Sequence, residues 1–328
     1  MLCVLGFLIH PSIPGAAMDF LEEHFQVTCN PHNRALSREE LLEGVAGKAG
    51  ILSLLTDTMD AEVMDRAGKG LKIIANYAVG YNNIDVAAAT KRKIAVSHTP
   101  GVLTDTTADL TMALILAVAR RIVEGDRYTR AGKYSGWDPL LLLGSDVHHK
   151  TLGILGFGRV GQAVARRARG FDMRIMYHGR HRAKPERDKV LGAEFVELDT
   201  LMSESDFLSI HVPLTPQTKG MIDAERLSLM KPESFIINTA RGEVVREQAL
   251  VEALEEKRIA GAGLDVFERE PKIHAELRKM GNVIILPHIG SASLETRTEM
   301  GLMAARNLIA LFNGDVPPNC LNPEICKP

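Results

Sequence analysis

Residues 151–166 read Thr-Leu-Gly-Ile-Leu-Gly-Phe-Gly-Arg-Val-Gly-Gln-Ala-Val-Ala-Arg, which is an apolar run, a G-x-G-x-x-G turn and an alternating apolar and basic segment. This pattern predicts a strand, a phosphate-binding turn and a helix whose free N–H groups face an anion. Gly156 permits the tight turn, Gly158 lets a pyrophosphate approach the backbone, and Gly161 lets the helix pack on the strand. We expect a dinucleotide to contact Gly156, Phe157, Gly158, Arg159, Val160 and Gly161.

The rest of the chain alternates short apolar runs with helical spacers, which predicts parallel sheets covered by helices. The expected strands lie at 4–9, 51–55, 73–75, 94–96, 173–177, near 196, and at 206–212, 235–238, 262–267 and 283–286. Because 328 residues exceed the usual size of a single core, we expect two domains. The predicted fold is α/β with two doubly wound parallel-sheet domains: residues 1–100 completed by 291–328, and a larger Rossmann dinucleotide-binding domain at 101–290.

Three helices carry recognisable end signals. Ser37-Arg-Glu-Glu40 is a capping box. Thr and Asp residues in the segment 99–109 are suited to cap a long helix, which we expect to run to about Arg130 and to cross between the domains. A further helix at 294–312, followed by Gly314, is expected to return to the first domain.

The composition is that of an ordinary globular protein, with a net charge of -2 and 24% charged residues, and it indicates no nucleic-acid partner. The N-terminus has no basic leader, and the apolar stretch at 110–119 is too short to cross a bilayer. We therefore expect a cytoplasmic protein without a membrane partner. The cysteines lack C-x-x-C spacing, which favours reduced thiols over disulfides or a metal site. They are Cys3, Cys29, Cys320 and Cys326.

The residues after the second strand of the dinucleotide unit indicate which cofactor is used. Tyr177 is followed by His-Gly-Arg-His-Arg, with no acidic residue before Glu186. A carboxylate there would bind a ribose 2′-hydroxyl, whereas Arg180, His181 and Arg182 can bind a 2′-phosphate. The sequence thus favours NADP(H), with NAD(H) possible, although a solvated basic loop is an alternative interpretation.

Three polar residues follow three of the expected strands of the larger domain: Arg241, Glu270 and His288. Because parallel strands end at one edge of a sheet, we expect these residues to form one site. Reduction of a 2-keto acid needs a cation for the carboxylate and carbonyl, a proton donor for the alkoxide, and a group that keeps the donor protonated. Arg241, His288 and Glu270 can serve these purposes in that order.

Two further segments are candidates for binding. The loop 76–85, which contains Val79 and Gly80, can direct backbone N–H groups at a carboxylate, although an ordinary strand-to-helix turn is the alternative. Trp137 and the leucines at 140–143 lie in a loop-like stretch, where apolar side chains indicate a subunit contact.

These motifs together resemble the D-isomer-specific 2-hydroxyacid dehydrogenase family, and most closely its glyoxylate/hydroxypyruvate reductase branch. The resemblance rests on the turn at 156–161, Asn-Thr-Ala-Arg-Gly at 238–242, Gly-Leu-Asp-Val-Phe-Glu-Arg-Glu-Pro at 263–271 and Leu-Pro-His-Ile-Gly-Ser at 286–291. Tyr-His-Gly-Arg at 177–180 resembles the NADPH-preferring members. Asp109 is a conservative departure, since many relatives carry Glu there.

The resemblance implies reduction of glyoxylate or hydroxypyruvate to the 2-hydroxy acid by hydride transfer. It implies that Arg241 binds substrate, that Glu270 and His288 are the acid/base pair, and that the domain formed by 1–100 and 291–328 contributes amides of Val79 and Gly80 to the substrate carboxylate. It further implies a homodimer in which Trp137 enters the neighbouring substrate pocket. The remaining cofactor contacts that we expect are Thr106, His211, Thr239, Ala240, Asp265 and Gly290.

Other functions remain possible from the sequence. Some proteins of this fold are dinucleotide-sensing corepressor scaffolds, although the complete set of Arg241, Glu270 and His288 favours an enzyme. A phosphoglycerate dehydrogenase usually prefers NAD and often carries an added regulatory domain, for which we expect no room here. A formate dehydrogenase is disfavoured because those enzymes carry Gln at the position of Glu270.

Overall fold

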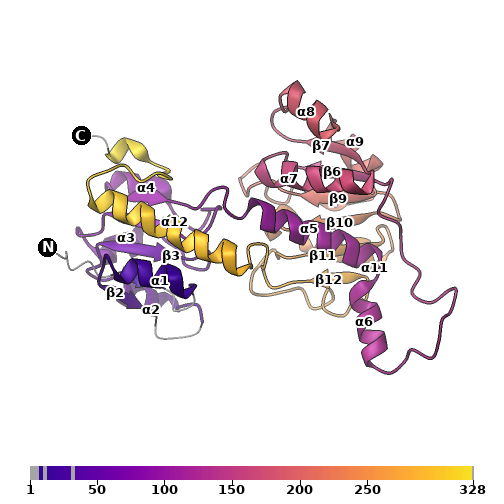
Figure 1. Cartoon of the computed structure of the whole chain (residues 1–328), viewed down its shortest axis with the longest axis horizontal. Helices are drawn as coiled ribbons and strands as arrows, with labels where there is room; N and C mark the ends of the chain where they lie inside the picture. Colours follow the sequence, from indigo (N-terminus) through magenta and orange to yellow (C-terminus); the bar gives the residue numbers. More distant parts are fainter. Residues whose placement is uncertain (1–6, 10–12, 31–33, 327–328) are drawn as a thin grey trace. The chain divides into compact units, whose positions relative to one another are not determined.

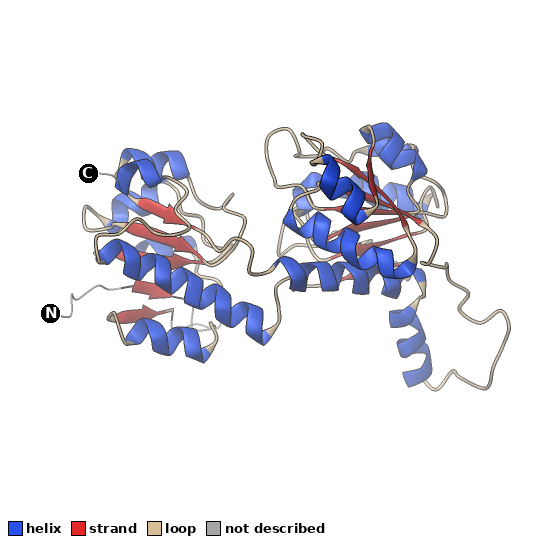
Figure 2. Cartoon of the chain, turned by 45° about the horizontal axis from the view of Figure 1, so that its top comes forward, coloured by secondary structure: helices blue, strands red, loops and turns tan. Residues whose placement is uncertain are grey.

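The structure is a computed structural model that describes residues 7–9, 13–30 and 34–326. Cys3 and the first part of the strand expected at 4–9 lie outside the described residues. The chain forms two compact units: unit 1 comprises the residues up to Leu103 and those from Ser291 onward, and unit 2 is Thr104–Gly290. In each unit, helices lie on both faces of a sheet (Figure 2). No helix in the described part of the chain is long and apolar enough to cross a membrane.

Unit 1 has a parallel sheet of five strands among its described residues, in the order β2-β1-β3-β4-β5. The strands are β1 (Phe7–Ile9), β2 (Val27–Cys29), β3 (Gly50–Ser53), β4 (Ile73–Asn76) and β5 (Ala95–Ser97). The helices are α1 (Gly15–Glu22), α2 (Arg38–Gly44), α3 (Ala61–Ala67), α4 (Val86–Lys91) and α12 (Leu294–Phe312). Successive residues of β4 face opposite layers: Ile73 packs in a core with α1 and α12, and Ile74 in a core with α2, α3 and α4.

Unit 2 has a parallel sheet of seven strands among its described residues, in the order β12-β11-β10-β9-β6-β7-β8. The strands are β6 (Thr151–Leu155), β7 (Arg174–His178), β8 (Ala193–Phe195), β9 (Phe207–Ile210), β10 (Phe235–Asn238), β11 (Gly261–Leu264) and β12 (Val283–Ile285). The helices are α5 (Thr104–Ala119), α6 (Ile122–Arg130), α7 (Arg159–Ala168), α8 (Pro185–Leu191), α9 (Leu198–Glu204), α10 (Ala224–Ser228) and α11 (Glu247–Glu255). Ile237 packs in the core with α5 and α7, and Ile236 in the core with α9, α10 and α11.

Several local predictions are confirmed. The helix expected at 294–312 has these bounds, and it packs on α1 and β4 of unit 1 (Figure 1). The capping box is formed, because the Ser37 side chain accepts a hydrogen bond from the Glu40 N–H while the Glu40 carboxylate accepts one from the Ser37 N–H.

The expectation of one continuous helix from about 104 to Arg130 is wrong. α5 ends at Ala119, and Arg121 adopts a left-handed conformation with φ 51°, which no α-helix accommodates. The Arg121 guanidinium pairs with Glu124 in the first turn of α6 and donates to the Leu143 carbonyl, so these contacts fix the break. α6 has no buried residue, and α6 and the loop after it extend away from the sheet of unit 2 (Figure 1).

One strand was not expected from the sequence, and another lies slightly before its expected position. β2 was not expected, because three residues at the edge of a sheet give too short a pattern to detect. The short strand expected near 196 is β8, which ends at Phe195. Val196 instead donates its N–H to the Tyr177 carbonyl just beyond the strand.

Candidate active site

The glycine turn between β6 and α7 has the geometry that its sequence predicts. Gly156 has φ +100°, and a Cβ added there would lie 2.7 Å from the backbone carbon of His211. A Cβ at Gly161 would lie 2.2 Å from the carbonyl oxygen of Gly156, so only glycine lets α7 pack this closely on the turn. A Cβ at Gly158 would meet nothing within 4 Å. Of the three glycines, only Gly158 therefore has free space beside its Cα. This is the position at which a bound pyrophosphate would approach the backbone.

The loop after β7 distinguishes the two candidate arginines. The Tyr177 hydroxyl donates to the Asp188 carboxylate over 2.8 Å and accepts the N–H of Ala183. Arg182 is paired with the same carboxylate over 3.3 Å. Arg180 and His181 are exposed and have no hydrogen bond or ion pair with the described residues. The Arg180 cation is thus available to a ligand, whereas the Arg182 cation braces the loop.

The two side chains expected to act as an acid/base pair are in contact. Nδ1 of His288 lies 2.8 Å from Oε2 of Glu270, and Oε1 of Glu270 accepts the N–H of Phe267 over 3.1 Å. Burial by itself would raise the pKa of Glu270, but the hydrogen bond and charge of His288, the Phe267 N–H and the Arg241 charge lower that pKa below its usual value. Glu270 is therefore a carboxylate at neutral pH. It can hold the imidazole in one orientation, with Nε2 on the opposite side of the ring.

The backbone of the histidine loop is held by Asp265, which is fully buried. His288 has φ 55°, in the left-handed region that non-glycine residues seldom adopt. Its N–H donates to the Asp265 carbonyl over 3.0 Å, and the Asp265 carboxylate accepts the N–H groups of Ile289 and Gly290 over 2.7 Å each. Burial raises the pKa of Asp265, although these N–H groups and the His288 charge act in the other direction. One side chain thus maintains a strained loop that carries the imidazole.

Arg241 is positioned by Asn238, the last residue of β10. The Asn238 amide donates to the Arg241 carbonyl over 2.9 Å and accepts the Ala240 N–H over 3.0 Å, which turns the chain after the strand. A Cβ at Gly242 would lie 1.9 Å from the Phe267 backbone, so this turn packs directly on the segment that leads to Glu270. Burial lowers the pKa of the Arg241 guanidinium, while the Glu270 charge raises it, and an arginine remains a cation under these conditions.

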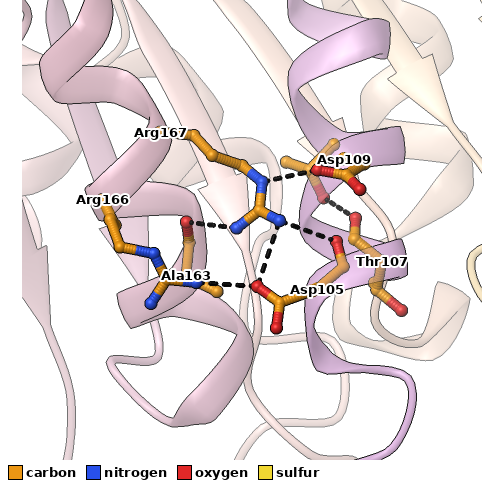
Figure 3. A network of polar contacts seen from close by, with 7 residues as sticks. Asp105, Thr107, Asp109, Ala163, Arg166 and Arg167 are labelled. Atoms are coloured by element: carbon orange, nitrogen blue, oxygen red, sulfur yellow. Dashed lines mark hydrogen bonds and ion pairs between the residues drawn. The ribbon is translucent and has the colours of Figure 1, made fainter.

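The start of α5 and the last turn of α7 are joined by an ion-pair network (Figure 3). Nε of Arg167 lies 2.6 Å from the Asp109 carboxylate, and Nη2 of Arg167 lies 3.0 Å from the Asp105 carboxylate. The Asp105 carboxylate also pairs with Arg166 over 2.7 Å. The Arg167 side chain is only 23% exposed, so its two pairs are partly shielded from solvent on the arginine side, whereas the Arg166–Asp105 pair is exposed. Asp109, which stands where many relatives carry Glu, therefore still provides an acidic partner for α7.

No cluster of residues able to hold a metal ion occurs in the part of the chain that the structure describes.

Comparison with known proteins decides the family. A family model described as "D-isomer specific 2-hydroxyacid dehydrogenase, NAD binding domain" matches residues 112–290. A glyoxylate reductase of Thermococcus onnurineus is 52% identical over 322 residues, which are 97% of this chain and 96% of that protein. The chain belongs to the D-isomer-specific 2-hydroxyacid dehydrogenase family.

Solved structures of related 2-hydroxyacid dehydrogenases agree with the fold. A glyoxylate reductase from Paecilomyes thermophila has a TM-score of 0.87 at 35% identity, covering 99% of this chain and 100% of that one. An NADPH-dependent glyoxylate/hydroxypyruvate reductase from Sinorhizobium meliloti, solved with NADP and malonate, has a TM-score of 0.85 at 32% identity, covering 98% of each chain.

The other expected site residues of this dehydrogenase lie in several places. The Thr239 hydroxyl is 2.9 Å from that of Thr111 in α5, and Thr106 lies in the first turn of α5. Nε2 of His211 is 2.8 Å from the Ser209 hydroxyl, and burial lowers the pKa of His211 to about 3, so its imidazole is neutral. Val79 and Gly80 belong to unit 1. Trp137 is 84% exposed, next to exposed Tyr134, Leu140 and Leu143.

Two threonines that hold the dehydrogenase loops together were not expected from the sequence. The Thr107 hydroxyl donates to the Gly290 carbonyl over 3.1 Å. The Thr111 hydroxyl donates to the Thr107 carbonyl over 2.8 Å and also lies 2.9 Å from the Thr239 hydroxyl. Their side chains are buried in α5. The only signal was a cluster of threonines at a helix start, which capping explains equally well.

Proposed function

We propose that this chain is an NADP(H)-preferring reductase of small 2-keto acids, with glyoxylate or hydroxypyruvate as substrate. The single observation that carries the proposal is the pair formed by Nδ1 of His288 and the Glu270 carboxylate at 2.8 Å, because a carboxylate that orients an imidazole is the arrangement that general-acid catalysis uses. The 52% identity to a curated glyoxylate reductase, over 97% of the chain, supports this substrate class.

In the proposed reaction, Arg241 binds the substrate carboxylate and the keto oxygen, and polarises the carbonyl. The dinucleotide, when bound, supplies the hydride that the keto carbon accepts. Nε2 of His288 donates a proton to the keto oxygen as negative charge develops there, which yields the 2-hydroxy acid. Glu270, ionised at neutral pH, stabilises the imidazolium through Nδ1 before transfer and orients the ring throughout.

The residues present fit a phosphate-bearing dinucleotide. The open position at Gly158 and the start of α7 provide room and N–H donors for a pyrophosphate. The exposed cation of Arg180, with His181, is suited to a ribose 2′-phosphate, and no acidic side chain follows β7 before Glu186. These features support NADP(H) as the preferred cofactor, with NAD(H) as a weaker one.

The exposed apolar side chains of the loop after α6 support a homodimer. Trp137, Leu140 and Leu143 are 84%, 75% and 61% exposed, which is unfavourable for side chains of this size in water. We propose that they contact a second copy, in which Trp137 borders the substrate pocket. A cytoplasmic location is part of this proposal.

The test is steady-state oxidation of NADPH by the purified protein with glyoxylate, hydroxypyruvate and other 2-keto acids, repeated with NADH. We expect turnover with glyoxylate or hydroxypyruvate and a higher kcat/KM with NADPH. Saturable NADPH binding without turnover of any 2-keto acid would instead indicate the dinucleotide-sensing scaffold. Higher kcat/KM with NADH would overturn the cofactor preference alone.

A further inference from the structure

The loop that follows β4 in unit 1 has both of its central carbonyl groups held by side chains. The Val79 carbonyl accepts a hydrogen bond from Nδ1 of His98 over 2.9 Å. The Gly80 carbonyl accepts one from the Asn76 amide over 2.8 Å. Because a carbonyl can only accept, the proton of the His98 ring must be on Nδ1 in this contact.

The direction of these two carbonyls determines the direction of two N–H groups. In a planar trans peptide the C=O and the following N–H point in opposite directions. The Gly80 N–H therefore points away from His98, and the Tyr81 N–H points away from Asn76. Neither N–H has a hydrogen-bond partner among the described residues, and Tyr81 is 44% exposed, so both donors are available to a ligand.

The two anchoring side chains are themselves fixed. Asn76 is fully buried at the end of β4, and its Oδ1 accepts the Ser53 hydroxyl of β3 over 3.1 Å. His98 directly follows β5, and its ring meets that of Tyr81 edge to face with centroids 5.8 Å apart. The loop is thus preorganised by side chains from three neighbouring strand ends, which lowers the entropic cost of ordering donors around an anion.

We propose that His98 is a positioning residue for substrate: by holding the Val79 carbonyl, it directs the Gly80 N–H toward the carboxylate of the 2-keto acid. Asn76 does the same for the Tyr81 N–H. This rests on the proposed function and on the implication of the family resemblance that amides of Val79 and Gly80 contact the substrate carboxylate alongside Arg241, and it adds the side chains that orient the loop. His98 itself does not touch the substrate.

The test compares three variants. His98→Leu removes the donor, while His98→Asn keeps an amide donor near the position of Nδ1. His24→Leu is the matched control, because Nδ1 of His24 also contacts a backbone carbonyl, that of Phe20, in the same unit over 2.9 Å. We expect His98→Leu to raise KM for glyoxylate and the dissociation constant of oxalate about tenfold, the worth of one charge-assisted hydrogen bond, with kcat little changed.

NADPH affinity should be unaltered in all three variants. His98→Asn should restore KM to within about threefold of wild type, and His24→Leu should not change it. Unchanged oxalate affinity in His98→Leu overturns this proposal alone. A loss of thermal stability that accompanies the KM change and that Asn fails to rescue would also overturn it, because the role would then be structural. A wild-type protein that binds oxalate without turning over glyoxylate would contradict the proposed function instead, and the oxalate measurements would still test His98.

Discussion

Nδ1 of His288 lies 2.8 Å from Oε2 of Glu270, although the two residues are 18 positions apart in the chain. They meet because β11 and β12 are adjacent in the parallel sheet, and each residue follows the end of one of them. The pairing leaves Nε2 as the ring atom that can donate to a substrate oxygen. This relationship leads to the first two predictions.

Replacing His288 by Ala should reduce kcat for 2-keto acid reduction by about 10²- to 10⁴-fold, the usual contribution of a positioned general acid. The dissociation constant of NADPH should change little. Single-turnover kinetics with pre-bound NADPH would measure the chemical step directly. Near-normal turnover at neutral pH would mean that another group donates the proton.

Glu270→Gln should shift the alkaline limit of reduction to lower pH. The pKa of Glu270 lies below its usual value, so the carboxylate is ionised across the neutral range and favours the imidazolium over the neutral ring. Gln keeps the shape but not the charge, so it no longer favours the imidazolium over the neutral ring. The measurement is kcat/KM against pH for both proteins, and an unmoved alkaline limit would contradict the assignment.

Two glycines of the same turn should respond differently to alanine. Gly161→Ala places a Cβ 2.2 Å from the Gly156 carbonyl and should cost about 1–3 kcal/mol of unfolding free energy through overpacking. Gly158→Ala meets no protein atom within 4 Å, so it should leave the unliganded protein stable but weaken dinucleotide binding. Denaturant unfolding without cofactor and NADPH titration would separate the two effects. Equal destabilisation would exclude the ligand-facing role of Gly158.

Arg180→Asp should weaken NADPH use far more than NADH use. A lost charge-assisted contact and the new repulsion together predict roughly a 10- to 100-fold fall in kcat/KM for NADPH. Arg278→Asp makes the same charge change at another exposed arginine and is the control. Parallel losses for both cofactors would show that Arg180 does not contact the 2′-phosphate.

Trp137→Ala should raise KM for the 2-keto acid while leaving NADPH affinity nearly intact, because the aromatic ring is proposed to border the neighbouring substrate pocket. Trp137→Phe should retain most of the wild-type KM. Sedimentation velocity on the same samples reports the oligomeric state. A fully active wild-type monomer would refute the shared site.

Features that depend on short stretches of sequence were predictable. The βαβ unit around Gly156, the capping box at Ser37 and the helix at Leu294–Phe312 all have the expected positions. In each case glycine geometry, side-chain capping or helical periodicity acts within a few residues of the signal. The break at Arg121 was missed because it depends on a contact with the Leu143 carbonyl, 22 residues away.

The sequence by itself therefore determined the strand–turn–helix for a dinucleotide, the α/β class and the identities of the three catalytic candidates. Only the tertiary structure decided which side chains meet: Glu270 with His288, Asp265 with the backbone of the histidine loop, and Asp188 with Arg182, which leaves Arg180 available to a ligand. The reason is physical. Local conformational preferences act between near neighbours in the chain, whereas strand order and packing select among long-range contacts that no short segment specifies.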